Sequence, residues 1–130
     1  MKILIIEDSR FLRMSNERAL IRAGHDVISS GDGQEGLRLA LEQKPDLVIL
    51  DLILPKLPGR EVLRELRANS DTASVPVMIV SSLPQANGPK LLDEGATTYY
   101  EKSRLMLDCG PDKFVQCANQ ILYRSKPART

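Results

Sequence analysis

The sequence predicts an α/β domain built on a five-stranded parallel sheet with helices on both faces. Apolar segments of strand length alternate five times with segments whose apolar residues recur at helical spacing. The run at residues 47–50 (Leu-Val-Ile-Leu) is apolar at every position, which is typical of a strand covered on both faces. With 130 residues, the chain is long enough for one such domain.

The first half of the chain is expected to form strands at residues 2–7, 26–30 and 46–51. Asp8 and Ser9 offer N-cap oxygens for a helix that Gly24 ends, because glycine readily adopts the left-handed conformation that follows a helix. A Gly-Asp-Gly turn then leads into a second helix at 34–43, which ends before Pro45.

The second half repeats this pattern. The loop at 52–59 contains two prolines and ends in Gly59, so it is expected to follow a defined path. Further strands are expected at 75–80 and 97–101, with helices at 60–68, 89–94 and 111–123. Residues 1–124 are therefore predicted to form one domain, followed by a basic tail at 125–130.

The composition argues against several classes of protein. A net charge of +1 and the lack of tryptophan do not suit direct nucleic-acid binding, which needs basic patches or stacking rings. The apolar runs are too short to cross a membrane, and the N-terminal segment lacks a signal-peptide cleavage site, so we expect a cytoplasmic protein. Cys109 and Cys117 lack metal-ligand spacing and are expected to be free thiols.

Polar side chains follow the predicted strands at their carboxyl ends, which meet at one edge of a parallel sheet. They are Glu7, Asp8, Asp51, Ser81 and Lys102. Crowded carboxylates raise one another's pKa unless a cation lies among them, and oxygen ligands suit Mg²⁺. The hydroxyl and the ammonium would then bind a phosphoryl group that Asp51 accepts as nucleophile. Each residue alone could be a cap or a surface group, but their joint placement favours the phosphoryl site.

The same residues carry a resemblance to a known family. The matching segments are 5–9 (Ile-Ile-Glu-Asp-Ser), 50–55 (Leu-Asp-Leu-Ile-Leu-Pro) followed by Gly59, 75–82 with its paired serines, and 95–102. In order and spacing these segments resemble the receiver domain of bacterial two-component response regulators. The resemblance implies the flavodoxin-like (βα)5 fold.

The resemblance also implies how Mg²⁺ and the phosphoacceptor are arranged. Asp51 is implied to be the phosphoacceptor and a metal ligand. Asp8 and the backbone carbonyl of Ile53 complete the direct protein ligands of Mg²⁺, and Glu7 acts through water.

The remaining implied roles concern the phosphoryl group and the switch. Ser81, the backbone N–H of Ser82 and Lys102 bind the phosphoryl group. Ser81 turns toward that group on phosphorylation, and Tyr99 swings into the space that Ser81 leaves. The expected donor is a histidine kinase or a phosphotransfer protein, and the signal passes to an unidentified downstream protein. Homodimerisation stays open, and we expect either a stand-alone receiver or one cut from a longer regulator.

Three departures from the family pattern stand out. Ser103 occupies the place of a proline that often follows the lysine with a cis bond, which leaves a trans link or a strained cis link open. The loop from Ser103 to Gly110 is longer than usual, and 84–89 is a poor helix. Ile53 and Leu83 are hydrophobic where the family often has polar side chains, so slow hydrolysis of the acyl phosphate is expected.

Two other functions are compatible with parts of this pattern. A pseudo-receiver would keep the fold and bind its partner without phosphorylation. The intact acceptor set argues against it, whereas the altered segment after Lys102 keeps it open. A phosphohydrolase of the haloacid dehalogenase type would need a second aspartate two residues after the nucleophile, where this chain has Ile53.

Overall fold

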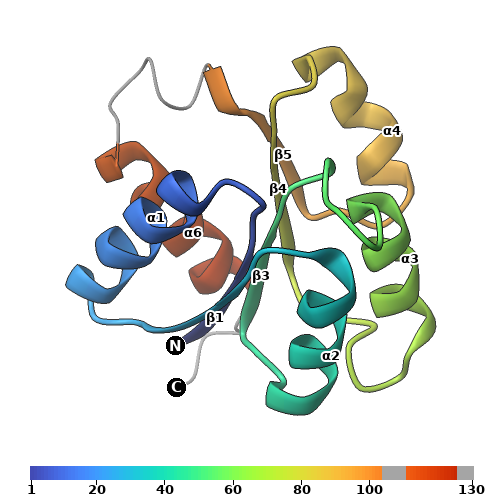
Figure 1. Cartoon of the computed structure of the whole chain (residues 1–130), viewed down its shortest axis with the longest axis horizontal. Coiled ribbons are helices and arrows are strands. Elements are labelled where there is room, and N and C mark those ends of the chain that lie inside the picture. The colour runs from blue at the N-terminus through green and yellow to red at the C-terminus, as the bar shows by residue number, and fades with distance from the viewer. Residues whose placement is uncertain (104–110, 126–130) are drawn as a thin grey trace.

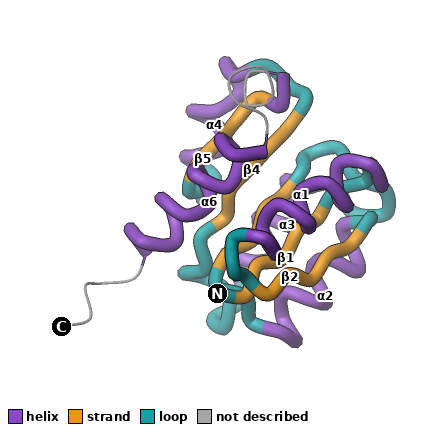
Figure 2. The backbone as a smooth tube through the Cα atoms, turned by 90° about the vertical axis from the view of Figure 1, so that its left-hand side faces the viewer, coloured by secondary structure: helices purple, strands orange, loops and turns teal. Residues whose placement is uncertain are grey.

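The strands form one parallel sheet in the computed structural model, which describes residues 1–103 and 111–125 (Figure 1). They are β1 (Lys2–Ile6), β2 (Asp26–Ser30), β3 (Leu47–Leu50), β4 (Val77–Ser81) and β5 (Thr98–Glu101). Their order across the sheet is β2-β1-β3-β4-β5, and each neighbouring pair is parallel. Figure 2 shows the strands, in orange, with the helices around them. The predicted fold class is therefore confirmed.

Helices cover both faces of this sheet. They are α1 (Arg10–Arg22), α2 (Gly33–Gln43), α3 (Gly59–Ala68), α4 (Gly88–Asp93) and α6 (Pro111–Ser125), with a 3-10 turn η1 (Gln85–Asn87) before α4. Figure 1 shows α1 and α6 on one face and α2, α3 and α4 on the other. Among the described residues, no helix is long and apolar enough to cross a membrane.

Most predicted boundaries hold to within two residues. β4 begins at Val77 rather than at residue 75, because Pro76 has no N–H to donate to a strand ladder. The poor helix expected before Pro89 is a 3-10 turn followed by the six-residue α4. Residues 104–110 of the predicted loop from Ser103 to Gly110 lie outside the described residues, as does the chain beyond residue 125.

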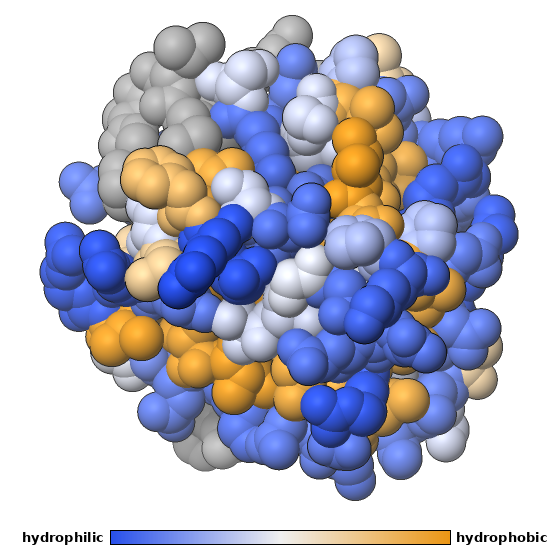
Figure 3. All heavy atoms as spheres, in the orientation of Figure 1, coloured by the Kyte–Doolittle hydropathy of each residue, from blue (hydrophilic) through white to orange (hydrophobic). Residues whose placement is uncertain are grey.

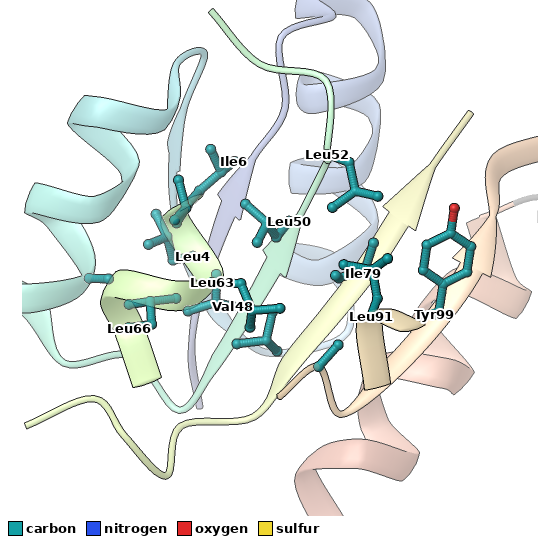
Figure 4. Packing of buried hydrophobic residues seen from close by; sticks show 14 residues of the cluster. Leu4, Ile6, Val48, Leu50, Leu52, Leu63, Leu66, Ile79, Leu91 and Tyr99 are labelled. Atoms are coloured by element: carbon teal, nitrogen blue, oxygen red, sulfur yellow. The ribbon is translucent and has the colours of Figure 1, made fainter. Parts of the chain in front are cut away.

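Two apolar cores lie on opposite sides of the sheet. Successive residues of a strand point to opposite faces, so β1 supplies Leu4 and Ile6 to one core and Ile3 and Ile5 to the other. Figure 4 shows the first of these cores, in which strand residues pack against α3 and α4. Each core removes large side chains from water, and this burial is the main force that holds the layers together.

The short helix α4 is fastened to α3 by charged side chains. Arg60 of α3 pairs with Glu94 at the end of α4, and Arg64 lies 3.6 Å from the same carboxylate. Arg67 donates to the carbonyl oxygen of Gly95 at 3.0 Å. These contacts position α4 although its six residues are too few to be stable alone.

The loop between β3 and α3 passes so close to the start of α3 that only glycine fits there. Gly59 donates its N–H to the carbonyl oxygen of Leu52 at 2.9 Å. A Cβ atom at Gly59 would lie 2.2 Å from the carbonyl oxygen of Asp51 and 2.6 Å from the Cα of Leu52. The missing side chain therefore lets α3 begin directly against the backbone of Asp51.

We expect Gly59→Ala to lower the free energy of unfolding by about 1–3 kcal/mol, because backbone atoms cannot move aside for the added methyl group. The better helix propensity of alanine offsets at most about 1 kcal/mol of that loss. Urea unfolding followed by circular dichroism measures the change. Glu65→Ala is the control, because it changes an exposed position of the same helix and adds no atoms to a packed region. Equal midpoints for Gly59→Ala and the wild-type protein would contradict the close approach.

Candidate functional site

Three of the predicted site residues meet at the carboxyl edge of the sheet. Glu7 follows β1, Asp51 follows β3 and Lys102 follows β5. The Lys102 ammonium nitrogen lies 2.5 Å from Oε1 of Glu7 and 3.0 Å from Oδ2 of Asp51. Because β4 separates β5 from β3, the long lysine side chain crosses the end of β4 to reach both carboxylates.

Glu7 is buried and held through all its polar groups. Its N–H donates to the carbonyl oxygen of Ser30 at 3.0 Å, and its Oε2 accepts from the N–H of Ser9 at 3.0 Å. Burial raises the pKa of Glu7, and the hydrogen bonds from Lys102 and Ser9 only partly offset this rise. The nearby charge of Asp51 raises the pKa further.

Asp51 is also buried, with 6% of its surface exposed. Its N–H donates to the carbonyl oxygen of Ile6 at 3.0 Å, which extends the pairing of β3 with β1 by one residue. Its Oδ1 accepts from the N–H of Ile53 at 3.3 Å, while Oδ2 pairs with Lys102. Burial alone would lower the pKa of Lys102, but the hydrogen bonds to Glu7 and Asp51 outweigh it, so that pKa is raised.

Asp8 does not join this cluster. Its side chain is exposed and makes no hydrogen bond or ion pair with the described residues. Within the described ranges, no group of three or more acidic, histidine or cysteine side chains is placed to hold a metal. The sequence predicted three crowded carboxylates, whereas the structure brings two together and neutralises them with Lys102. The available oxygen donors are the Asp8 and Asp51 carboxylates and the carbonyl of Ile53, a donor set whose chemistry fits Mg²⁺.

The two predicted switch residues meet at the backbone of Leu83. Ser81 is wholly buried, and its Oγ accepts from the N–H of Leu83 at 3.2 Å. The hydroxyl of Tyr99 donates to the carbonyl oxygen of Leu83 at 3.0 Å. Tyr99 lies in the core, as Figure 4 shows, and burial raises its pKa. Ser82, whose backbone was predicted to bind the phosphoryl group, is exposed.

The structure shows which isomer the peptide bond between Lys102 and Ser103 adopts. The described residues contain no cis peptide bond, so the link from Lys102 to Ser103 is trans. The Ser103 hydroxyl donates to a carboxylate oxygen of Glu101 at 3.2 Å. Replacement of the usual proline is therefore accommodated without a cis bond.

Hydrophobic side chains stand beside this polar site. Ile53 is 56% exposed and Leu83 is 36% exposed, although most large apolar side chains of the domain are buried. Figure 3 shows that the face in view is mainly hydrophilic, with its hydrophobic side chains gathered in separate areas. The two hydrophobes predicted to limit access of water are thus at the surface, next to the strand ends that carry Asp51 and Ser81.

One residue at this edge had no sequence signal. Arg13 of α1 donates from Nη1 to the backbone carbonyl oxygen of Glu7 at 2.7 Å. A backbone acceptor leaves no trace in the sequence, because any residue at position 7 would offer the same oxygen.

Comparison with known proteins identifies the family of this domain. A family model described as the response regulator receiver domain matches residues 3–106. The chain is 40% identical over 102 residues to the probable transcriptional regulator ycf27 of Porphyridium aerugineum, a match that covers 78% of this chain and 41% of that protein. The chain thus spans about two fifths of that relative's length.

Solved structures agree with the fold. The receiver domain of the Francisella response regulator 1452 has a TM-score of 0.84 at 25% identity, covering 96% of this chain and 98% of the other. The Mn²⁺-bound form of the response regulator Rcp1 has a TM-score of 0.80 at 26% identity and covers 99% of both chains.

Lys102→Met would leave two buried carboxylates without their cation. We expect the pKa of Glu7 to rise further, because the hydrogen bond from Lys102 now lowers it. When the pKa of Glu7 is higher in the folded state than in the unfolded chain, the folded state loses stability as the pH rises. The free energy of unfolding of Lys102→Met should therefore fall between about pH 5 and pH 8.

Urea unfolding in metal-free buffer at both pH values measures this difference. Lys90→Met, which removes an exposed lysine of α4, is the control. The same pH dependence in both variants would show that Lys102 does not hold the two carboxylates.

Proposed function

The chain belongs to the response regulator receiver family, the signalling domain of two-component systems, and on this premise we propose that Asp51 is its phosphoacceptor. The observation that carries the proposal is the ion pair of Lys102 with Asp51 and Glu7. It places a cation at the atoms where phosphoryl charge would appear. The proposed receiver comprises residues 1–124.

The proposed metal is Mg²⁺, held by the carboxylates of Asp8 and Asp51 and by the carbonyl of Ile53. Glu7, whose Oε2 accepts from Ser9 and whose Oε1 pairs with Lys102, is proposed to act on the ion through water. When bound, Mg²⁺ would supply positive charge to the phosphoryl oxygens. Asp8 is free to turn toward such an ion, since no described residue holds its side chain.

In the proposed reaction, a carboxylate oxygen of Asp51 attacks the phosphorus of a phosphohistidine. The new O–P bond forms as the P–N bond breaks, and the imidazole of the donor leaves with the electron pair. Lys102 neutralises one phosphoryl oxygen, while Ser81 and the N–H of Ser82 donate to others. The donor would be a histidine kinase or a phosphotransfer protein.

The signal would leave the site through Leu83. The Oγ of Ser81 now accepts from the N–H of Leu83, and a turn of this hydroxyl toward the phosphoryl group would break that hydrogen bond. The carbonyl of the same residue is held by Tyr99, so the two proposed switch residues are joined through one peptide segment. A change there would alter the surface beside α4 and β5, where a downstream protein partner would bind.

Phosphorylation is tested by the intact mass of the protein after incubation with acetyl phosphate and Mg²⁺. We expect a gain of one phosphoryl group, lost on adding a chelator. Asp51→Asn should gain none, because the amide lacks the nucleophilic oxygen anion yet keeps the size of the side chain. Labelling of Asp51→Asn would place the acceptor elsewhere. If the wild-type protein gains no phosphoryl group, the alternative hypothesis of a pseudo-receiver is favoured. In that case the substitution Asp51→Asn should leave binding of the partner unchanged.

Hydrolysis of the acyl phosphate should be slow, because Ile53 and Leu83 offer an attacking water no hydrogen bond. We expect Ile53→Asn to speed the loss of phosphate by up to about tenfold, the effect of one added hydrogen bond on the barrier. Mass spectrometry over time measures the half-life after the donor is removed. Leu92→Asn, at an exposed apolar position on α4, is the control and should keep the wild-type half-life. An unchanged half-life in Ile53→Asn would refute the role of this position.

A further inference from the structure

The side chain of Arg13 extends from α1 and binds the backbone just after the end of β1. Its own N–H donates to the carbonyl oxygen of Ser9 at 2.9 Å, so its backbone belongs to α1. Its guanidinium Nη1 donates to the carbonyl oxygen of Glu7 at 2.7 Å. The side chain therefore links the first turn of α1 to the residue that starts the carboxyl edge.

This bond fixes the peptide that leads into Asp8. The N–H of Glu7 donates to Ser30 and its carbonyl is held by Arg13, so the backbone of Glu7 is held on both sides. A peptide unit is planar, and holding its oxygen fixes the plane that contains the N–H of Asp8. Because the Asp8 side chain has no bond of its own to the described residues, its direction depends on that backbone.

The charge of Arg13 stays separate from the charges of the site. The guanidinium binds a neutral carbonyl instead of a carboxylate. The carboxylates of Glu7 and Asp51 form ion pairs with Lys102 instead. Arg13 can thus hold the backbone without occupying a carboxylate oxygen that a metal ion would need.

Gly31 provides the space for this guanidinium. A Cβ atom at Gly31 would lie 2.8 Å from Nη1 of Arg13 and 3.5 Å from its Cζ. The backbone of Gly31 is outside the left-handed region, so alanine could adopt it. The glycine is therefore needed for room and not for conformation, and the turn between β2 and α2 forms one wall around the Arg13 side chain.

We infer that Arg13 is a positioning residue, which holds the Glu7 carbonyl so that Asp8 is directed toward the Mg²⁺ site beside Asp51. This inference rests on the proposed function, because it assigns Arg13 a part in the metal binding that phosphorylation would need. Its effect is transmitted through the backbone, and Arg13 itself touches neither the metal nor the phosphoryl group.

The test measures Mg²⁺ affinity by calorimetry on four variants of the full chain. We expect Arg13→Gln to weaken Mg²⁺ binding by about tenfold, the usual effect of removing a group that orients a metal ligand. Gly31→Ala should weaken it similarly, because the methyl group displaces the guanidinium while the charge stays. Arg13→Lys, which keeps a cationic donor, should recover part of the affinity. Arg18→Gln removes an exposed charge from the same helix and should bind as the wild-type protein does.

Amide NMR spectra of the metal-free proteins provide a second readout. The Asp8 amide should shift in Arg13→Gln and Gly31→Ala but not in Arg18→Gln. Wild-type Mg²⁺ affinity in both Gly31→Ala and Arg13→Gln would overturn the inference. If Arg13→Gln does not fold, the Mg²⁺ affinity of Gly31→Ala alone tests the inference. Failure of the proposed function would look different from failure of this inference, because the wild-type protein itself would then take up no phosphoryl group.

Discussion

The carboxyl edge of this sheet depends on Lys102, because two buried carboxylates would otherwise face each other without a cation. Glu7 and Asp51 are each at least 94% removed from solvent, and burial of an unpaired carboxylate is costly. The lysine satisfies both from β5, across the end of β4. The ion pair therefore joins the ends of β1, β3 and β5, and the order of the strands in the sheet is what brings these three side chains together.

Close backbone packing holds Asp51 in place beneath that ion pair. Its N–H continues the ladder with β1, and its carbonyl oxygen lies where a side chain at residue 59 would need to be. Asp51 is thus fixed by main-chain contacts on two sides, and its carboxylate is oriented by the N–H of Ile53 and by Lys102. If Asp51 is the nucleophile, as proposed, a carboxylate held in this way would need little reordering before it reacts.

The fold and part of the site could be predicted from the sequence because their signals are periodic or chemical. Five alternations of strand and helix specify the sheet, and carboxylates and a lysine after apolar runs identify its polar edge. Two features could not be predicted. Glu7 and Asp8 look equivalent in the sequence, but successive residues at the end of a strand point in opposite directions, so one is buried and the other exposed. The bond from Arg13 ends on a backbone oxygen, which every residue type shares.

The peptide segment at Leu83 explains how a small change at the site can reach the surface. Its N–H donates to the hydroxyl oxygen of buried Ser81, and its carbonyl oxygen accepts from the hydroxyl of Tyr99, so moving either side chain would leave a backbone group without its partner. Losing one such hydrogen bond costs on the order of 1–3 kcal/mol when the group is shielded from water, which is enough to favour a different path of the segment. The 3-10 turn and the short α4 that follow have few internal bonds to resist it. Their position depends instead on ion pairs with α3 and on Leu91 of α4, which is buried in the first core.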